Sequence, residues 1–275
     1  MSPSISALLA QLAPRPGDRA ANLAALAAAL EAHPEVELAV LPELFLSGYG
    51  PDAVAAAGCG ADELTPVREL AARHATAVVV GFAERADGVV YDAMACVDRD
   101  GALAGVYRKT HLFDGERDVF AAGDELLLCE LAGRRVGILN CMDIEFPEPA
   151  RALARAGAEL LVTASANMSP YWDCHDLHAR ARALDNRLAH LYSNRPGAEA
   201  GLRFVGGSRA ITSDGAVVAE CGRDEDELLA VDLDLDRGEP RLDYVALARG
   251  PLPVASGHGR SASTAAPSAN GVASS

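Results

Sequence analysis

The sequence lacks the segments that would carry a protein into or across a membrane. No apolar run approaches the roughly 18 residues of a membrane-spanning helix, and the N-terminus has no basic start followed by an apolar stretch and a cleavage site. We therefore expect a cytoplasmic protein. Net positive charge is also lacking, because 39 acidic side chains and 24 lysines and arginines give a formal charge of −15. Repulsion from phosphate argues against nucleic acid or an anionic membrane surface as a partner.

Closely spaced cysteine pairs are lacking too. A chain of 275 residues, half of them hydrophobic and only 5% aromatic, can bury a large core without disulfide bonds. We therefore expect reduced thiols and one large domain over residues 1–249. Serine, alanine, glycine and proline dominate residues 250–275, which we expect to be a disordered tail. The six cysteines are Cys59, Cys96, Cys129, Cys141, Cys174 and Cys221.

Hydrophobic periodicity and turn residues predict alternating strands and helices. Asp-Gly dipeptides at 87–88 and 100–101 predict antiparallel pairing of consecutive strands, so the sheet is expected to be mixed. The second half has a similar order of elements, which predicts two α/β layers of similar build. Strands are expected over residues 4–12, 37–41, 77–83, 89–97, 102–107, 125–131, 134–140, 159–164 and 189–193, with a further pair around 213–215. Helices are expected over residues 19–32, capped by Asp18, and over 63–74, 147–157 and 173–188.

Three chemically active side chains stand where predicted strands end. They are Glu43 in LPELFL, Lys109 in YRKTHLF and Cys141 in GILNCMDIEFPE. Taken singly, each has an ordinary explanation, because most glutamates and lysines are solvated and most cysteines pack as small hydrophobic residues. Cys141, however, lies on a turn between a strand and the helix that Pro147 opens. Unpaired backbone N–H groups at such a turn favour a thiolate or a forming oxyanion.

One short segment has the spacing of a metal site. In WDCHDLH, Cys174 and His178 are four residues apart and could share a helix face, with Asp173 or His175 nearby. No second ligand pair of matching spacing occurs elsewhere in the sequence. We therefore favour the beginning of a helix here, and we expect no metal site.

The blocks LPELFLSGY, YRKTHLF and GILNCMDIEFPE, in this order and at these separations, resemble the three signature blocks of the nitrilase superfamily of carbon–nitrogen hydrolases. The segments ERDVFAAGDE, ELLVTASANMSPY, ARARALDNRLAHLYSNR and FVGGSRAITSDG extend the resemblance over residues 4–236. It implies a four-layer αββα sandwich with two mixed β-sheets, and a homodimer or larger assembly. The last block, EPRLDYVALARGPL, matches only loosely, which puts dimer contacts through the tail in doubt.

The resemblance also implies a catalytic set. By motif, this set is Glu43, Lys109 and Cys141, with Glu116 assisting. Cys141 would attack an amide or nitrile carbon, and Lys109 and the backbone N–H of Met142 would hold the oxyanion. Glu43 would hand a proton to departing ammonia and then activate the water that cleaves the thioester. No metal or organic cofactor is required.

This chemistry needs two pKa values to approach each other. An ordinary thiol, with a pKa of about 8.5, and an ordinary glutamate, with a pKa of about 4.3, are mismatched by about four units. We expect burial to raise the pKa of Glu43, and Lys109 and the turn N–H groups to lower the pKa of Cys141. The gap would then close from both ends.

The substrate is less well defined by the sequence. A mixture of aromatic and polar residues in the pocket-lining segments suggests a small to medium amide with one polar handle, although each aromatic residue could equally pack a loop. Two residues beside the nucleophile, Asn140 and Met142, depart from the usual pattern and could reshape the acyl pocket. The expected substrate-binding residues are Phe45, Tyr49, Met142, Asn167, Tyr171 and Trp172.

Several functions stay open at this point. FVGGSR and SANMSPY look more like those of bacterial amidases, which favours an amidase that releases ammonia from a carboxamide. The same catalytic residues would serve a nitrilase or an N-carbamoyl hydrolase. A non-catalytic binding module on this fold is disfavoured because all the catalytic residue types remain. A papain-like protease is disfavoured because no Cys-Gly-Ser-Cys-Trp signature is present.

Overall fold

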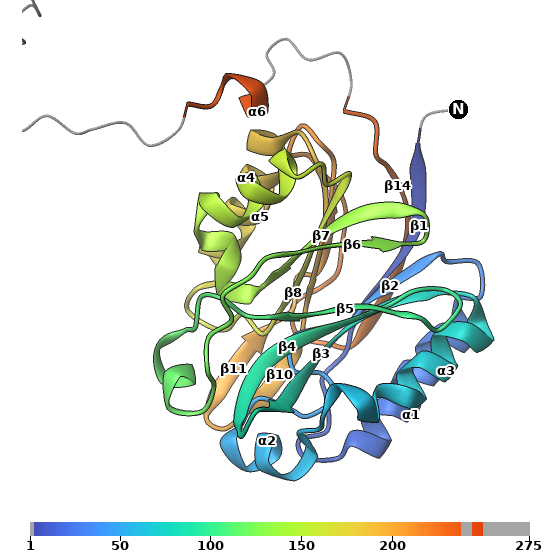
Figure 1. The fold of residues 1–275 in the computed structure, drawn as a ribbon, viewed down its shortest axis with the longest axis vertical. Helices are drawn as coiled ribbons and strands as arrows, with labels where there is room; N and C mark the ends of the chain where they lie inside the picture. Colours follow the sequence, from blue (N-terminus) through green and yellow to red (C-terminus); the bar gives the residue numbers. More distant parts are fainter. Residues whose placement is uncertain (1–2, 238–243, 250–275) are drawn as a thin grey trace, which may run out of the picture.

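The computed structural model describes residues 3–237 and 244–249, and its centre is a pair of facing sheets (Figure 1). The first sheet has the strand order β14-β1-β2-β3-β4-β5 and the second has the order β13-β12-β9-β8-β7-β6. The first contains β1 (Ser4–Gln11), β2 (Leu38–Val40), β3 (Ala77–Ala86), β4 (Val89–Val97), β5 (Leu103–Arg108) and β14 (Glu227–Asp234). The second contains β6 (Leu127–Leu131), β7 (Arg134–Asn140), β8 (Leu160–Ser165), β9 (Ala189–Asn194), β12 (Arg209–Ile211) and β13 (Val217–Glu220).

Both sheets are mixed, as predicted. β1, β2 and β3 run parallel, whereas β4, β5 and β14 pair antiparallel with their neighbours. In the second sheet β7, β8 and β9 are parallel, and their neighbours are antiparallel. The two Asp-Gly turns connect β3 to β4 and β4 to β5, and the strands of each pair are antiparallel, as predicted.

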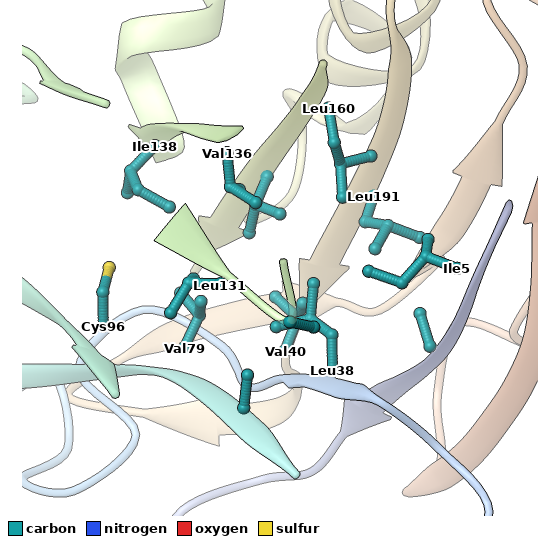
Figure 2. Close-up of a cluster of buried hydrophobic side chains, with 14 of the residues drawn as sticks. Ile5, Leu38, Val40, Val79, Cys96, Leu131, Val136, Ile138, Leu160 and Leu191 are labelled. Atoms are coloured by element: carbon teal, nitrogen blue, oxygen red, sulfur yellow. The ribbon is translucent and has the colours of Figure 1, made fainter. Parts of the chain in front are cut away.

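The main hydrophobic core lies between the sheets and contains side chains from both (Figure 2). Alternation along β1 shows how one strand serves two layers, because successive side chains point to opposite faces of a sheet. Ile5, Ala7 and Leu9 face the inter-sheet core, while Leu8 and Ala10 pack in a second cluster on the outer face. Side chains labelled in Figure 2 are Ile5, Leu38, Val40, Val79 and Cys96 from the first sheet and Leu131, Val136, Ile138, Leu160 and Leu191 from the second.

Helices cover the outer face of each sheet. α1 (Arg19–Ala32) and α3 (Thr65–His74) pack Leu26, Leu30 and Val67 against the first sheet. α4 (Pro147–Arg155) and α5 (Trp172–Asn186) pack Leu153 and Ala179 against the second. Helices therefore flank two stacked sheets (Figure 1), which confirms the four-layer αββα sandwich.

The predicted capping residue placed the beginning of α1 correctly. The Asp18 side chain accepts a hydrogen bond of 3.0 Å from the backbone N–H of Ala21, so it caps α1 as predicted.

All six cysteines are free thiols. The prediction of a disordered tail over residues 250–275 lies outside the described residues. In residues 3–237 and 244–249, no helix has both the length and the apolar character needed to cross a bilayer.

Some elements were not predicted. They are short or weakly patterned: α2 (Pro51–Ala57), α6 (Tyr244–Leu247), the two-stranded sheet of β10 (Pro196–Glu199) and β11 (Leu202–Val205), and the edge strand β14. Three single turns of 3₁₀-helix were also not predicted: η1 (Ala61–Leu64), η2 (Asp114–Asp118) and η3 (Cys141–Glu145). η3 separates β7 from α4, and η2 holds Glu116. Two of these turns therefore position predicted site residues.

Candidate active site

The structure brings the three predicted strand ends together. Lys109 follows β5, Cys141 follows β7, and Glu43 lies in the loop after β2. The side chains of Glu43 and Lys109 are fully buried, and Lys109 Nζ donates a hydrogen bond of 2.5 Å to Glu43 Oε1. The ordinary explanation, in which both side chains are solvated at the ends of strands, is therefore wrong.

A close backbone approach places Glu43. The loop lies directly on β3, where Leu46 N donates to Gly81 O at 2.9 Å and Gly81 N donates to Pro42 O at 3.3 Å. A Cβ atom on Gly81 would lie 2.2 Å from the backbone nitrogen of Leu44, so only glycine permits this contact. The loop thereby holds the Glu43 carboxylate between the two sheets, where its Oε2 accepts a 2.5 Å hydrogen bond from Ala166 N.

Lys109 is surrounded by three carboxyl groups. Its Nζ atom lies 2.5 Å from Glu43, 2.8 Å from Glu116 and 3.3 Å from Asp92. One ammonium cannot neutralise three buried carboxylates, so protonation of some of them is favoured. Accordingly, burial raises the pKa of Asp92 well above its usual range, with repulsion from Glu43 adding to it, and burial also raises the pKa of Glu116. Asp92 was not among the predicted site residues.

The pKa of Glu43 shifts in the opposite direction from the one expected. Burial raises it, but attraction to Lys109 and hydrogen bonds with Asp92, Lys109 and Cys141 outweigh burial, so the pKa is lowered. The expectation that burial would raise this pKa is therefore wrong. The contact with Lys109 is the physical reason, because a partner charge at hydrogen-bond distance favours the ionised form.

Cys141 is the first residue of η3, and it is buried. Its φ angle of 46° lies in the left-handed region, which is strained for a residue with a side chain. Burial and the charge of Glu43 raise the pKa of the thiol well above its ordinary value, although Lys109 and a hydrogen bond from Ser165 act against them. Ser165 Oγ lies 3.4 Å from the sulfur. The resting site thus pairs a neutral thiol with an ionised Glu43, and the predicted closing of the pKa gap is wrong.

Glu116 connects this charged cluster to the cavity. Its Oε1 accepts hydrogen bonds of 2.8 Å from Lys109 Nζ and from the Tyr49 hydroxyl, and its Oε2 accepts one of 2.8 Å from the backbone of Phe113. Tyr49 and Phe113 line the same cavity as Cys141. Glu116 therefore holds Lys109 on one side and the cavity wall on the other.

Asp143 joins the turn that holds Cys141 to the end of β5. It is fully buried, and its two oxygens accept five hydrogen bonds. The donors are the hydroxyls of Tyr107 (2.7 Å) and Thr110 (2.9 Å), the backbone N–H (3.0 Å) and ring Nδ1 (2.8 Å) of His111, and the backbone N–H of Asn140 (2.9 Å). This carboxylate therefore fixes the turn that holds Cys141 relative to the segment that holds Lys109.

Replacing Asp143 with alanine is expected to lower the free energy of unfolding by about 3 kcal/mol, because several buried donors lose their acceptor. Hydrogen bonding to Asp143 raises the pKa of His111. The stabilisation from charged His111 is therefore present below an unfolded pKa of about 6.5 and disappears as the pH rises through the folded value. The loss caused by Asp143→Ala should thus be larger at pH 6 than at pH 9 in urea unfolding.

The matched control for this prediction is Asp118→Ala, because Asp118 is exposed at the end of η2. A surface substitution of this kind should change the free energy of unfolding by less than about 0.5 kcal/mol. Equal urea midpoints for the two variants would contradict the role given to Asp143.

A cavity of about 100 Å³ opens above Cys141. Of the predicted substrate-binding residues, four line this cavity: Tyr49, Met142, Asn167 and Tyr171. Phe45 does not, because it is fully buried in the cluster under α1 and α3. Trp172 is 38% exposed outside the cavity lining, with the Arg223 guanidinium stacked 3.5 Å from its ring centre.

The two residues beside Cys141 that depart from the family pattern lie in different surroundings. Met142 lines the cavity, whereas the Asn140 side chain is fully buried and donates a 2.9 Å hydrogen bond to Asp92 Oδ1. Asn140 therefore does not shape the acyl pocket directly. It holds Asp92 beside Lys109 instead.

The WDCHDLH segment begins α5, as favoured from sequence. Cys174 is exposed, whereas His175 is buried and bonds Tyr192 and Glu145. In the described part of the chain, the acidic, histidine and cysteine residues close enough to share a metal ion are Glu43, Asp92 and Glu116. Lys109 Nζ already contacts all three.

Four residues that contact Lys109 or Cys141, or line the cavity, were missed as site residues. Asp92 could have been recognised from sequence, because it is the single charged residue inside the apolar strand β4. Ser165 is the last residue of β8, and no sequence pattern marks it as a site residue. Glu145 and His175 pair across 30 positions of sequence, which no local pattern reveals.

The chain has relatives among known proteins. The model of the carbon–nitrogen hydrolase family matches residues 7–241. A protein of Pseudomonas protegens named "Hydrolase in pqqF 5′region" is 43% identical over 224 residues, which cover 79% of each chain. An (R)-stereoselective amidase of Pseudomonas sp. is 41% identical over 242 residues, which cover 86% of this chain and 88% of the amidase.

A solved structure shows the same fold. It is a glutamate-to-glutamine variant of an amidase from Nesterenkonia sp. AN1, with the acetamide moiety of fluoroacetamide added covalently at its active-site cysteine. The TM-score is 0.80 at 28% sequence identity, and the match covers 90% of this chain and 96% of that one.

Proposed function

Because this chain belongs to the carbon–nitrogen hydrolase family, and is thus a hydrolase of non-peptide carbon–nitrogen bonds, we propose that it converts small carboxamides to carboxylate and ammonia through a thioester on Cys141. One observation carries the proposal. A buried thiol at the base of a cavity lies beside a carboxylate that an equally buried ammonium keeps ionised. Such a carboxylate can accept the thiol proton as the sulfur attacks.

The first step joins proton transfer to bond formation. The pKa of the thiol is raised and that of Glu43 is lowered, so a free thiolate is not the resting species. The sulfur attacks the amide carbon while its proton moves to Glu43. The C–S bond forms, and the carbonyl electron pair becomes an oxyanion. Stabilisation of this oxyanion must therefore supply the driving force.

Two donors are available for the oxyanion. Met142 N–H belongs to the first turn of η3, where backbone N–H groups have no partner within the helix. Lys109 Nζ donates to Glu43 and Glu116 and lies 3.3 Å from Asp92, a carboxyl group whose pKa burial raises. Its third hydrogen would turn from Asp92 to the oxyanion as the oxyanion forms. Glu116 assists by fixing Lys109 and does not itself react.

Breakdown of the adduct completes the reaction. The C–N bond breaks as Glu43 returns its proton to the nitrogen, which leaves as ammonia. Glu43 then takes a proton from water as the water attacks the thioester, and the C–S bond breaks to restore the thiol and release the carboxylic acid. Glu43 accepts and returns every proton that moves in these steps, so the reaction needs no cofactor.

Two measurements test the proposal together. The protein should release ammonia from small amides faster than from matched nitriles or ureido acids. Intact mass spectrometry after rapid quenching should show an acyl adduct that maps to Cys141. Turnover of only nitriles or ureido acids would replace the amidase assignment with a nitrilase or N-carbamoyl hydrolase. Absence of both turnover and adduct would support a binding module.

We also propose a homodimer or larger assembly and a cytoplasmic location. The superfamily resemblance supports the first, and the six free cysteines, the state that a reducing compartment maintains, support the second. Sedimentation velocity of the purified protein tests the assembly state.

A further inference from the structure

One carboxylate of the cavity wall has no part in the proposed reaction. Glu145 is the last residue of η3 and lines the cavity that holds Cys141, with its side chain 33% exposed. Its Oε1 lies 3.3 Å from Nε2 of the buried His175. Within residues 3–237 and 244–249, no donor bonds its Oε2. This oxygen is therefore open to a group in the cavity.

The charge of Glu145 persists in this setting. The hydrogen bond from His175 lowers the pKa of Glu145. That hydrogen bond needs a proton only on Nε2, so a neutral imidazole satisfies it and leaves the carboxylate charge in place. The cavity wall therefore presents a negative charge to whatever enters.

No lysine or arginine in the described wall balances this charge, and the one basic side chain there, His175, can bond Glu145 as a neutral imidazole. The described lining contains no lysine or arginine, and Lys109 behind it is already engaged by three carboxyl groups. A carboxylate on the substrate would be desolvated beside Glu145 and Glu116 without a partner, which is costly. An ammonium group would find a partner in Glu145.

Aromatic rings form much of the remaining wall. Phe113 and Tyr171 pack edge to face with ring centres 5.7 Å apart, and Tyr49 lines the same cavity. Aromatic faces attract cations through the negative charge of their π-systems, and proteins combine them with carboxylates to bind amines. The wall thus has both features of an ammonium site.

We propose that Glu145 and this aromatic wall form a subsite for a positively charged group on the acyl chain of the substrate. The proposal rests on the proposed amidase function. In a primary carboxamide the leaving group is only ammonia, so the acyl chain must occupy the cavity. Glu145 follows Cys141 by four residues in a 3₁₀-turn that rises about 2.0 Å per residue, which suits an amine a few carbons from the amide.

A matched substrate series tests the subsite. Pentanamide, 4-aminobutanamide and glutaramate share one chain length and end in a methyl, an ammonium and a carboxylate group. We expect kcat/KM for 4-aminobutanamide to exceed that for pentanamide about tenfold, mainly through KM, as a partly exposed charge contact of about 1.4 kcal/mol would give. Glutaramate should be the poorest of the three.

Glu145→Gln is expected to reduce the ratio of kcat/KM for 4-aminobutanamide over pentanamide to about one. Glu145→Lys should invert the order and favour glutaramate. Glu148→Gln is the matched control, because Glu148 is exposed at the start of α4 and lies outside the cavity lining. This control should leave both the ratio and the activity unchanged. Because a ratio is measured, a general loss of folded protein does not alter it.

Binding separates this inference from the proposed function. Calorimetry on the Cys141→Ala variant should show tighter binding of 4-aminobutanamide than of pentanamide, even if no amide is turned over. Turnover of pentanamide and 4-aminobutanamide with equal kcat/KM, or a preference that survives Glu145→Gln, would overturn the ammonium subsite and leave the amidase assignment in place. Equal binding of the two ligands would also overturn it.

Discussion

Replacing Cys141 with alanine is expected to lower kcat for amides by at least about 10⁴-fold, because removal of a nucleophile leaves only binding and oxyanion stabilisation. Among the residues that line the described cavity, Cys141 carries the most nucleophilic group. Neither Ser165 nor His175 substitutes for it, since Ser165 lies behind the sulfur as its donor and His175 is held by Tyr192 and Glu145. Steady-state ammonia release measures the loss.

Cys174→Ala provides the matched control, because Cys174 is an exposed free thiol at the start of α5. This variant should keep normal turnover and normal acyl labelling of Cys141. Both variants should show the thermal midpoint of the original protein within a few degrees, so a change in kcat reports chemistry. Substantial turnover in Cys141→Ala would remove the sulfur from the mechanism.

Replacing Lys109 with methionine is expected to affect both catalysis and stability. The chain would lose its only lysine and leave three buried carboxyl groups without a cation. We expect a fall in kcat of at least about 100-fold from the lost oxyanion donor. We also expect unfolding free energy to fall by about 3–5 kcal/mol near pH 8, the usual cost of breaking a buried ion pair.

The pH dependence of this variant has a definite sign. Without Lys109 the folded pKa of the facing carboxyls should rise above the unfolded value of about 4, so the folded state binds protons more tightly. Stability should therefore recover as the pH falls from 8 towards 5. Urea unfolding at both values measures this, and the double variant Glu43→Gln/Lys109→Met should regain stability without regaining activity.

Arg99→Gln is the control for Lys109→Met, because Arg99 forms a 3.7 Å ion pair with Glu37 in which both side chains are more than 40% exposed. Its loss should cost less than about 1 kcal/mol. A Lys109→Met variant as stable as Arg99→Gln at pH 8 would show that the three carboxyls do not depend on the ammonium. Since Lys109 is the only lysine, ¹⁵N-lysine labelling would also report its titration as a single signal.

Periodicity and turn chemistry predicted two mixed α/β layers and placed Glu43, Lys109 and Cys141 at strand ends, whereas the four-layer sandwich and the catalytic set were implied by the resemblance to the nitrilase superfamily. The strands expected over residues 37–41, 102–107 and 134–140 end just before Glu43, Lys109 and Cys141. The parallel order of β1, β2 and β3 and of β7, β8 and β9 brings strand ends to one region. Local patterns could determine this much because alternation and turns are properties of neighbouring residues. The edge strand β14 was missed because its pairing with β1 joins the two ends of the described chain.

The pKa directions could not be predicted because each is a sum of opposing contacts. For Glu43, burial acts in one direction and the contacts with Lys109, Asp92 and Cys141 act in the other. Only the distances decide which prevails. Phe45 was misplaced for a similar reason, since a large apolar residue near a catalytic loop is equally suited to a cavity wall or to a core.

The buried and protonated state of Cys141 bears on how the protein meets oxidants. Peroxide and general alkylating agents react with exposed thiolates, and this sulfur is neither exposed nor ionised at rest. In the proposed reaction, ionisation is instead coupled to attack on a bound amide. Burial thus shields the Cys141 thiol from peroxide and alkylating agents, and exposed Cys174 is the thiol that such reagents meet first.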